Sequence, residues 1–317
     1  MSTAQPGAAA AAAVPAVPDV SLGKTLPDNA VLAIWLAIAC TVLFSGGDIA
    51  AKVLTETLPA GQVAWMRYAV FVATVIPFVL AMRGPSALRS SRPWWQAARG
   101  IGVVASSLLF VMGLGHLDVS EATAINFVSP IFMMALSIPM LGEKVGVRRW
   151  TAAAVSFAGV LVVVQPGTDA FSAAALFPMG AALCWAFAGI ITRLMGAERP
   201  ETTLVWSSVI GLAALTLVLP LGWTAPGWTE IGIALLMGIL STGGNWLAIL
   251  AFRLAPAAIL APFFYLQLVS AAFFSFMVYG TVPDNATFVG GAIIAASGLY
   301  VAHRERVRRK EALASRP

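Results

Sequence analysis

Asp48 and Lys52 stand four residues apart in the stretch FSGGDIAAK (44–52), which ends a long apolar run. That spacing places both side chains on one face of a helix. Arg67 and Glu121 add a second base and a second acid near the starts of later apolar runs. Together these four groups could bind a charged or zwitterionic ligand or form a gate. The alternatives are ion pairs that only fix helix packing, and side chains that extend to a polar boundary.

The other residues that commonly do chemistry are too dispersed for catalysis. His116 and His303 are far apart, and Cys40 and Cys184 each lie inside an apolar run. The chain has no HExxH, GxSxG or Walker motif, and a zinc site needs clustered ligands. The sequence therefore predicts a protein that is not an enzyme and that binds no metal or cofactor.

Composition indicates that the chain is dissolved in lipid. Hydrophobic residues make up 59% of it and charged residues only 10%, with a mean hydropathy of +0.87. A soluble domain has about 25% charged residues and could not bury this much apolar surface. The net charge of +5 is spread between apolar segments, so it does not predict nucleic-acid binding.

Ten apolar segments are long enough to be membrane spans, each of which needs about 20 residues. The predicted fold class is an all-α integral membrane protein, because a helix satisfies its own backbone hydrogen bonds in lipid. An alanine- and proline-rich disordered tail, 1–29, precedes the first span. The predicted spans are 30–52, 62–82, 94–115, 119–141, 148–165, 170–194, 201–221, 230–253, 256–280 and 286–304.

Lysine and arginine gather in the loops on one side of these spans. By the positive-inside rule that side is cytoplasmic, so both termini are predicted to be cytoplasmic in a bacterial inner membrane. Lys52 and Arg67 are the exceptions. The cytoplasmic bases are Arg83, Arg89, Arg92, Lys144, Arg148, Arg149, Arg193, Arg199 and Arg253, followed by those of the tail, which includes residues 305–317.

The chain also resembles itself. A shift of 141 positions places Lys52 on Arg193, Pro59 on Pro200 and Trp65 on Trp206 without a gap. Each unit then has five spans, and an odd number makes the second unit enter the membrane from the opposite face. Such inverted repeats are typical of carriers, with a substrate site near the midplane where the repeats meet.

The stretch EATAINFVSPIFMMALSIPMLGEKVGVRRWTAAAVSFAGVLVVV (121–164) resembles the EamA domain of the drug/metabolite transporter superfamily. The marks are Pro130 in mid-helix, Gly142-Glu143 at its end, a basic turn and a following helix. A similar copy spans 261–301, where Gly280-Thr281 departs from the common Gly-Glu. The resemblance implies two EamA repeats, 30–165 and 170–304, and export or exchange of small metabolites, which in some relatives are amino acids.

Polar and aromatic residues in mid-span are further candidates for substrate binding or gating. Asn126 lies near Pro130, while Tyr265 and Gln267 lie near Pro262; a proline kink frees a carbonyl, so such polar groups plausibly face water. Asn245 follows a glycine pair and either contacts a cavity or bonds another helix. Trp185 either stacks on a substrate or packs against lipid. The candidate set is Asp48, Lys52, Arg67, Glu121, Asn126, Trp185, Asn245, Tyr265 and Gln267.

The sequence thus predicts a secondary transporter that exports or exchanges a small metabolite, with amino acids as one candidate cargo, by alternating access. The alternatives are a multidrug or cation efflux carrier and a membrane-embedded lipid-modifying enzyme. The expected partners are the metabolite, the lipid bilayer and, as a candidate coupling ion, protons. Asp48 and Glu121 could take up such a proton, although the neighbouring bases favour their ionised forms.

Overall fold

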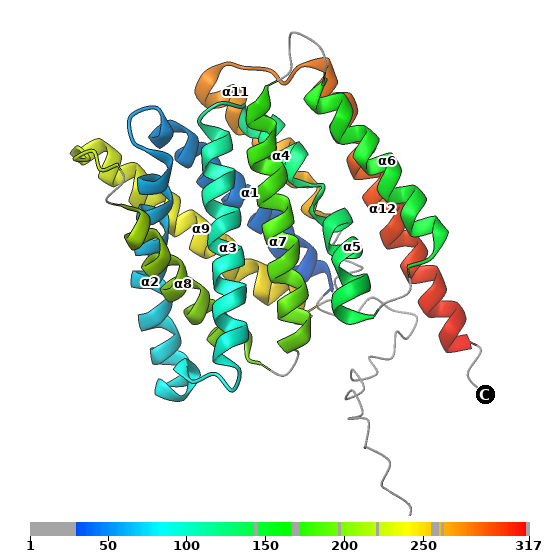
Figure 1. The fold of residues 1–317 in the computed structure, drawn as a ribbon, viewed down its shortest axis with the longest axis horizontal. Helices are drawn as coiled ribbons and strands as arrows, with labels where there is room; N and C mark the ends of the chain where they lie inside the picture. The colour runs from blue at the N-terminus through cyan, green and yellow to red at the C-terminus, as the bar shows by residue number, and fades with distance from the viewer. Residues whose placement is uncertain are drawn as a thin grey trace, which may run out of the picture.

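The computed structural model describes residues 30–142, 145–166, 172–195, 198–219, 222–254, 260 and 263–314, and all secondary structure within them is helical. The all-α prediction is therefore confirmed (Figure 1). The helices are α1 (Ala30–Thr55), α2 (Ala60–Arg83), α3 (Pro93–Leu114), α4 (Val119–Asn126), α5 (Ser129–Leu141), α6 (Val147–Val164), α7 (Leu176–Met195), α8 (Pro200–Val218), α9 (Trp228–Leu254), α11 (Leu266–Tyr279) and α12 (Asn285–Ala314), with 3-10 turns η1 (Pro85–Leu88) and η2 (Ala173–Ala175).

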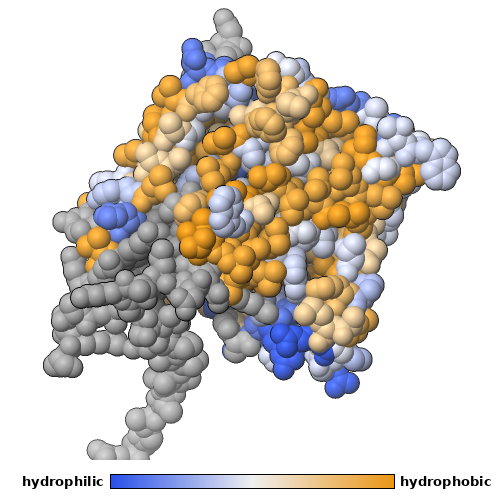
Figure 2. Space-filling model, turned by 180° about the vertical axis from the view of Figure 1, so that it is seen from behind, coloured by the Kyte–Doolittle hydropathy of each residue, from blue (hydrophilic) through white to orange (hydrophobic). Residues whose placement is uncertain are grey.

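The helices match the expected membrane spans. Among the described residues, seven helical stretches are long and apolar enough to cross a bilayer, and three shorter apolar helices accompany them. The shorter ones are Trp150–Val164, Leu266–Tyr279 and Asn285–Tyr300. Figure 2 shows a broad apolar band over one face, with hydrophilic residues mostly toward its ends. A band of this kind fits a lipid environment, since soluble monomers rarely expose such large apolar surfaces.

The fourth predicted span differs from a continuous helix. Its two parts, α4 and α5, are separated by a turn at Phe127 and Val128, and Pro130 follows at the start of α5. Proline lacks an N–H and its ring clashes with the preceding turn, so it is tolerated best at a helix start and kinks or breaks a helix interior. The kink expected at Pro130 is therefore a break. In the ninth span, α11 covers the second half, and Pro262 lies outside the described residues.

The helices pack in matched pairs. The contact between α1 and α9 is matched by the contact between α7 and α3. In the same way, α2 with α9 is matched by α8 with α3, and α1 with α11 is matched by α7 with α5. Helices α2 and α8 contact each other, as do α6 and α12, which lie together at one side in Figure 1. Two five-helix units related by a two-fold axis would give this pattern. The unit boundaries, 30–165 and 170–304, remain a prediction.

The aligned tryptophans make reciprocal contacts between the two predicted units. Trp65 of α2 donates its indole N–H to the Thr216 hydroxyl of α8 (2.9 Å). Trp206 of α8 donates to the Leu88 carbonyl of η1 (3.0 Å). Each tryptophan therefore fastens its own helix to the opposite unit, which gives a structural reason for this element of the repeat.

Glycine is required where the two counterpart helices α5 and α11 end. Gly142 and Gly280 each follow the last helical residue and have φ of +67°. This left-handed conformation is readily adopted by glycine and satisfies carbonyls at a helix end. Gly47 has a different role: a Cβ there would lie 2.8 Å from the Ser241 hydroxyl, so its absence lets α1 approach α9 closely.

Candidate functional site

A buried ion pair joins α1 to α2. Arg67 Nη2 lies 3.3 Å from Asp48 Oδ1 and 3.4 Å from the Gly47 carbonyl oxygen. Both charged side chains are largely buried, at 13% and 12% exposure for Arg67 and Asp48. A charge in a membrane span is tolerated when a partner of opposite sign compensates it. The structure thus brings two of the predicted site residues together.

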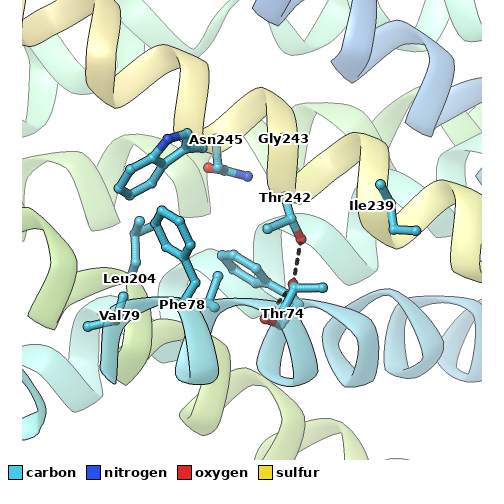
Figure 3. A pocket seen from close by; sticks show the side chains of 11 residues that line it. Thr74, Phe78, Val79, Leu204, Ile239, Thr242, Gly243 and Asn245 are labelled. Carbon is cyan, nitrogen blue, oxygen red and sulfur yellow. Dashed lines mark hydrogen bonds between the residues drawn. The ribbon is translucent and has the colours of Figure 1, made fainter. Parts of the chain in front are cut away.

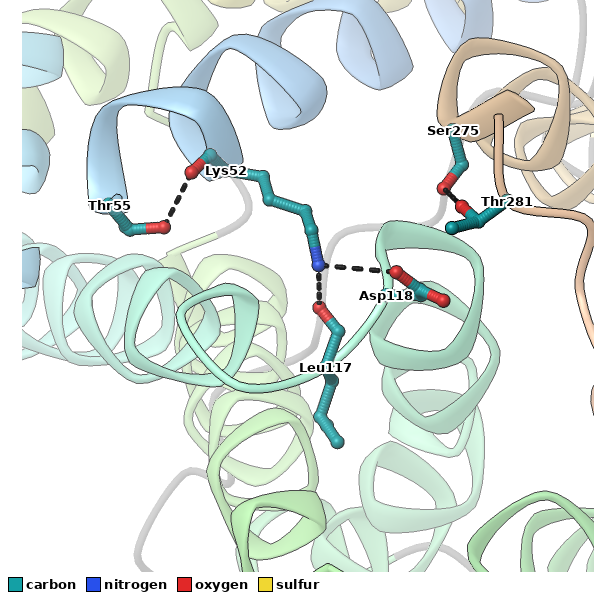
Figure 4. A network of polar contacts seen from close by, with 6 residues as sticks. All are labelled: Lys52, Thr55, Leu117, Asp118, Ser275 and Thr281. Atoms are coloured by element: carbon teal, nitrogen blue, oxygen red, sulfur yellow. Dashed lines mark hydrogen bonds and ion pairs between the residues drawn. The ribbon is translucent and has the colours of Figure 1, made fainter. Parts of the chain in front are cut away.

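Lys52 makes its hydrogen bonds apart from this pair, and its predicted part in substrate binding or gating remains a prediction. Its Nζ donates to the Leu117 carbonyl (2.6 Å) and to Asp118 Oδ1 (3.3 Å), and it lies 5.5 Å from the centre of the Tyr279 ring. Figure 4 shows the ammonium reaching from the end of α1 to the loop before α4. The long lysine side chain reaches these acceptors, so helical spacing alone did not identify its partner. Lys52 therefore connects α1 to the α3–α4 junction.

Glu121 lies beside the Lys52 contact. It is half-buried in the first turn of α4, and its carboxylate accepts a hydrogen bond from the Asp118 backbone amide. An acid at this position satisfies one of the free amides at a helix start and complements the helix dipole. The geometry gives Glu121 a capping role, and its predicted part in substrate binding remains a prediction.

Three further candidates lie where α4 and α11 cross. The Tyr265 ring stacks on Phe127 at 5.0 Å between centroids, and its hydroxyl lies against Gly298 of α12. The Gln267 carbonyl accepts a hydrogen bond from Ser45 of α1 (3.3 Å). The Asn126 side-chain oxygen is enclosed and has no hydrogen-bond partner among the described residues. These contacts give Tyr265 a packing role, while the enclosed Asn126 oxygen has no structural explanation.

A hollow of about 300 Å³ lies between α2 and α9, and we call it the α2–α9 groove (Figure 3). The Phe78 and Trp246 rings meet edge to face across it, with 4.5 Å between centroids. The Thr74 and Thr242 hydroxyls are 3.3 Å apart. Its lining residues are Phe71, Thr74, Val75, Phe78 and Val79 of α2, Leu204 of α8, and Ile239, Thr242, Gly243, Asn245 and Trp246 of α9.

The groove continues the face of α2 that holds the ion pair. Arg67, Phe71, Thr74 and Phe78 follow one another at intervals of four, three and four residues, which places them on one helical stripe. Arg67 on this stripe reaches Asp48 of α1, while Phe78 further along it is 41% exposed. A charged residue that begins an aromatic stripe was the sequence signal that could have identified Phe71, Thr74 and Phe78.

Only one predicted site residue, Asn245, is among the residues that line the groove. Its side-chain N–H donates to the Ser241 carbonyl one turn earlier (2.9 Å), so this bond stays within α9. Trp185 lies elsewhere, on α7, and is 45% exposed. Its predicted stacking on a substrate remains a prediction.

Among the described residues, no three His, Cys, Asp or Glu side chains come close enough together to hold a metal ion. Free Cys40 and Cys184 lie on α1 and α7.

The apolar helices and the paired intramembrane charges define a multi-pass helical membrane protein with a groove between α2 and α9. The sequence model of the EamA-like transporter family matches residues 31–165 and again residues 172–302. The chain belongs to this family, as the sequence resemblance predicted.

Characterised relatives are transporters of small molecules. The chain is 31% identical over 291 residues to a riboflavin transporter of Rhizobium johnstonii, covering 90% of this chain and 95% of the relative. It is 27% identical to an S-adenosylmethionine uptake transporter of Rickettsia prowazekii (86% and 92% covered). It is 25% identical to the pseudopaline exporter CntI of Pseudomonas aeruginosa (86% and 96% covered).

A solved crystal structure shares the fold, with a TM-score of 0.62 at 18% identity, covering 86% of this chain and 98% of that one. Together the family and the relatives show a small-molecule transporter rather than an enzyme. The alternative of a lipid-modifying enzyme is thereby set aside.

Proposed function

We propose that the protein is a secondary carrier for a small metabolite with a planar aromatic ring, which it moves by alternating access. The observation that supports this cargo class is the aromatic α2–α9 groove on the same helical face as the Arg67–Asp48 pair. Binding sites for small molecules are commonly apolar hollows of about 300–1,000 Å³ with a few placed polar groups. The groove has a volume at the low end of this range, and its surface is almost entirely apolar.

The groove offers two kinds of contact to such a cargo. The Phe71, Phe78 and Trp246 rings can pack against an aromatic plane. The Thr74 and Thr242 hydroxyls and the Asn245 amide oxygen can hydrogen-bond ring heteroatoms or hydroxyls. Riboflavin and S-adenosylmethionine, the cargoes named for two of the relatives, both contain a fused heterocycle. An amino acid without a ring would use less of this surface.

The Arg67–Asp48 pair favours metabolites over cationic drugs. A pump for apolar cations would gain from an intramembrane acid without a nearby base, whereas Asp48 is paired with Arg67. A zwitterionic or neutral cargo can exchange contacts with both members of the pair. This pair also gives the proposed carrier a polar gate, at the start of the α2 stripe that lines the groove.

We further propose that the carrier resides in the bacterial inner membrane with both termini in the cytoplasm, as the distribution of bases predicts. The relatives' names include uptake and export, so the predicted direction, export or exchange, stays part of the proposal. Exchange needs no coupling ion, and proton coupling through Asp48 or Glu121 is its alternative.

Counterflow in proteoliposomes tests the cargo. Vesicles loaded with unlabelled riboflavin, S-adenosylmethionine, mixed amino acids or ethidium would receive the matching labelled compound outside. We expect counterflow for a ring-bearing metabolite, and Trp246→Ala should lower its initial rate about tenfold, from lost stacking. Trp228→Ala is the matched control, since Trp228 is 90% exposed at the start of α9. Counterflow of amino acids alone, or of ethidium alone, would contradict the proposal.

A further inference from the structure

A second arginine, Arg99 of α3, is held by neutral groups alone. Its Nε donates to the Thr192 hydroxyl of α7 (3.3 Å), and its Nη1 donates to the Thr203 carbonyl of α8 (3.2 Å) and to the Ser207 hydroxyl. No described carboxylate lies within ion-pair distance of it. Its positive charge is therefore not compensated by an acid among the described residues.

The remaining nitrogen of Arg99, Nη2, is not fully enclosed. No described residue accepts a hydrogen bond from Nη2, and this atom is not among the fully enclosed polar atoms that lack a partner. Thr192, the residue next to this guanidinium, is exposed. One side of the guanidinium is thus fixed by three oxygens, while Nη2 on the other side has no described acceptor in a half-buried setting.

An arginine in this setting is suited to an oxyanion. A cation within a membrane span is costly, and neutral oxygens lower that cost without removing the charge. Guanidinium N–H groups form their shortest and strongest hydrogen bonds with carboxylate and phosphate oxygens. The neighbours support a fixed geometry, since Gln96 donates to the Thr203 hydroxyl (3.1 Å) and the Ser207 hydroxyl donates to the Thr203 carbonyl (2.7 Å).

We propose that Arg99 forms a binding site for an oxyanionic group, a carboxylate or a phosphate, at the junction of α3, α7 and α8. The group could belong to a soluble metabolite or to the headgroup of an anionic lipid, because both present the same oxygens. The site goes beyond the proposed cargo groove, and its existence does not depend on which ring-bearing compound is transported.

Thermal unfolding of the purified full-length protein in neutral detergent tests the site without any transport. Sodium phosphate and sodium succinate would be compared with sodium chloride at equal ionic strength. We expect either oxyanion to raise the unfolding midpoint saturably, by about 3–6 °C at ten times its dissociation constant. Arg99→Gln should abolish the rise, and the exposed Arg89→Gln control should keep it. No rise in the wild type, or an equal rise in Arg99→Gln, would overturn the proposal.

Two further experiments identify whether the oxyanion comes from a lipid or from solution, and they keep the proposal testable if Arg99→Gln fails to fold. In nanodiscs of phosphatidylglycerol, a lipid-occupied site would show no response to phosphate, whereas in phosphatidylcholine the response would return. A site for soluble anions would respond in both. Arg99→Lys keeps the positive charge but loses the paired guanidinium N–H groups that bind two oxygens at once. Its rise in unfolding midpoint with phosphate should therefore be smaller than that of the wild type. A lysine response as large as the arginine response would contradict a guanidinium site.

Discussion

Arg67 and Arg99 lie in counterpart groups of helices and differ in how their charge is met, although α2 and α3, which carry them, are not counterparts of each other. Arg67 lies within the group of helices α1, α2 and α9, and its guanidinium contacts the Asp48 carboxylate. Arg99 lies within the counterpart group, α7, α8 and α3, and its guanidinium contacts hydroxyls and a carbonyl. The packing of the two groups is matched, while their electrostatics are not.

The difference teaches that the repeat preserves the scaffold and the base at Lys52 and Arg193, while the Arg67–Asp48 pair occurs in one copy alone. Under the shift of 141 positions, Trp65 falls on Trp206, and both tryptophans fasten the two units together. Asp48 falls on Gly189 and Arg67 on Ser208, so the ion pair has no counterpart. Packing is needed twice, because both units must bury the same helix faces.

Removing Asp48, the acid of the α1, α2 and α9 group, should have the largest effect on stability. Asp48→Asn leaves Arg67 buried without a counter-ion, and breaking a buried pair in this way costs about 3–5 kcal/mol of unfolding free energy. The unfolding midpoint in detergent measures the loss. The double variant Asp48→Asn with Arg67→Gln should recover most of it, since no charge then remains. If the single variant is as stable as the wild type, Asp48 does not compensate Arg67.

Adding an acid beside Arg99 should make the α3, α7 and α8 group resemble the α1, α2 and α9 group, because its arginine then also has a counter-ion. Ser207→Asp places a carboxylate where the Arg99 guanidinium already donates to the Ser207 hydroxyl. We expect the rise in unfolding midpoint with phosphate to disappear, because the new carboxylate occupies the guanidinium. Ser208→Asn is the control, since Ser208 bonds the Val205 carbonyl of its own helix. A phosphate response that survives in Ser207→Asp would show that the anion binds elsewhere.

The sequence predicted the helices of the fold well, because length and apolarity determine a membrane span. It also identified Asp48 and Arg67, since charges are conspicuous in apolar runs. It placed Lys52 on the face of Asp48 without identifying its acceptors, because the acceptor at Leu117 depends on how the α3–α4 loop packs against α1. The groove residues Phe71 and Phe78 were missed, since aromatic residues in a span resemble lipid-facing ones until the neighbouring helix is known.

The Lys52 contact allows a smaller test of how the first group of helices is held to the rest of the bundle. Asp118 is 42% exposed, so its pairing with Lys52 should contribute no more than about 1 kcal/mol. Asp118→Asn should therefore lower the unfolding midpoint slightly, and Lys52→Met should lower it more, because the Leu117 carbonyl then loses its donor as well. Equal effects of the two variants would show that the carbonyl contact contributes nothing.

The smallest expected effect concerns Glu198, which ties the loop before α3 to the end of α7 next to the Arg99 region. Burial opposes ionisation of Glu198, but hydrogen bonds from the Ser91 hydroxyl and amide and from the Ser90 hydroxyl outweigh it and hold the pKa below its ordinary value of 4.5. A lowered pKa in the folded state means that the contact stabilises the fold fully above the ordinary pKa and loses this contribution as pH falls through the lower value.

The wild type should therefore lose slightly more thermal stability than Glu198→Gln when the pH is lowered from 6 to 3.5, because glutamine has no proton to gain. Unfolding midpoints of both proteins across this range measure the difference. Ser91→Ala should reduce the pH dependence partway, since Glu198 keeps the Ser91 backbone amide and the Ser90 hydroxyl as donors. Identical pH profiles for the wild type and Glu198→Gln would mean that this loop contact does not hold the α3 and α7 ends together.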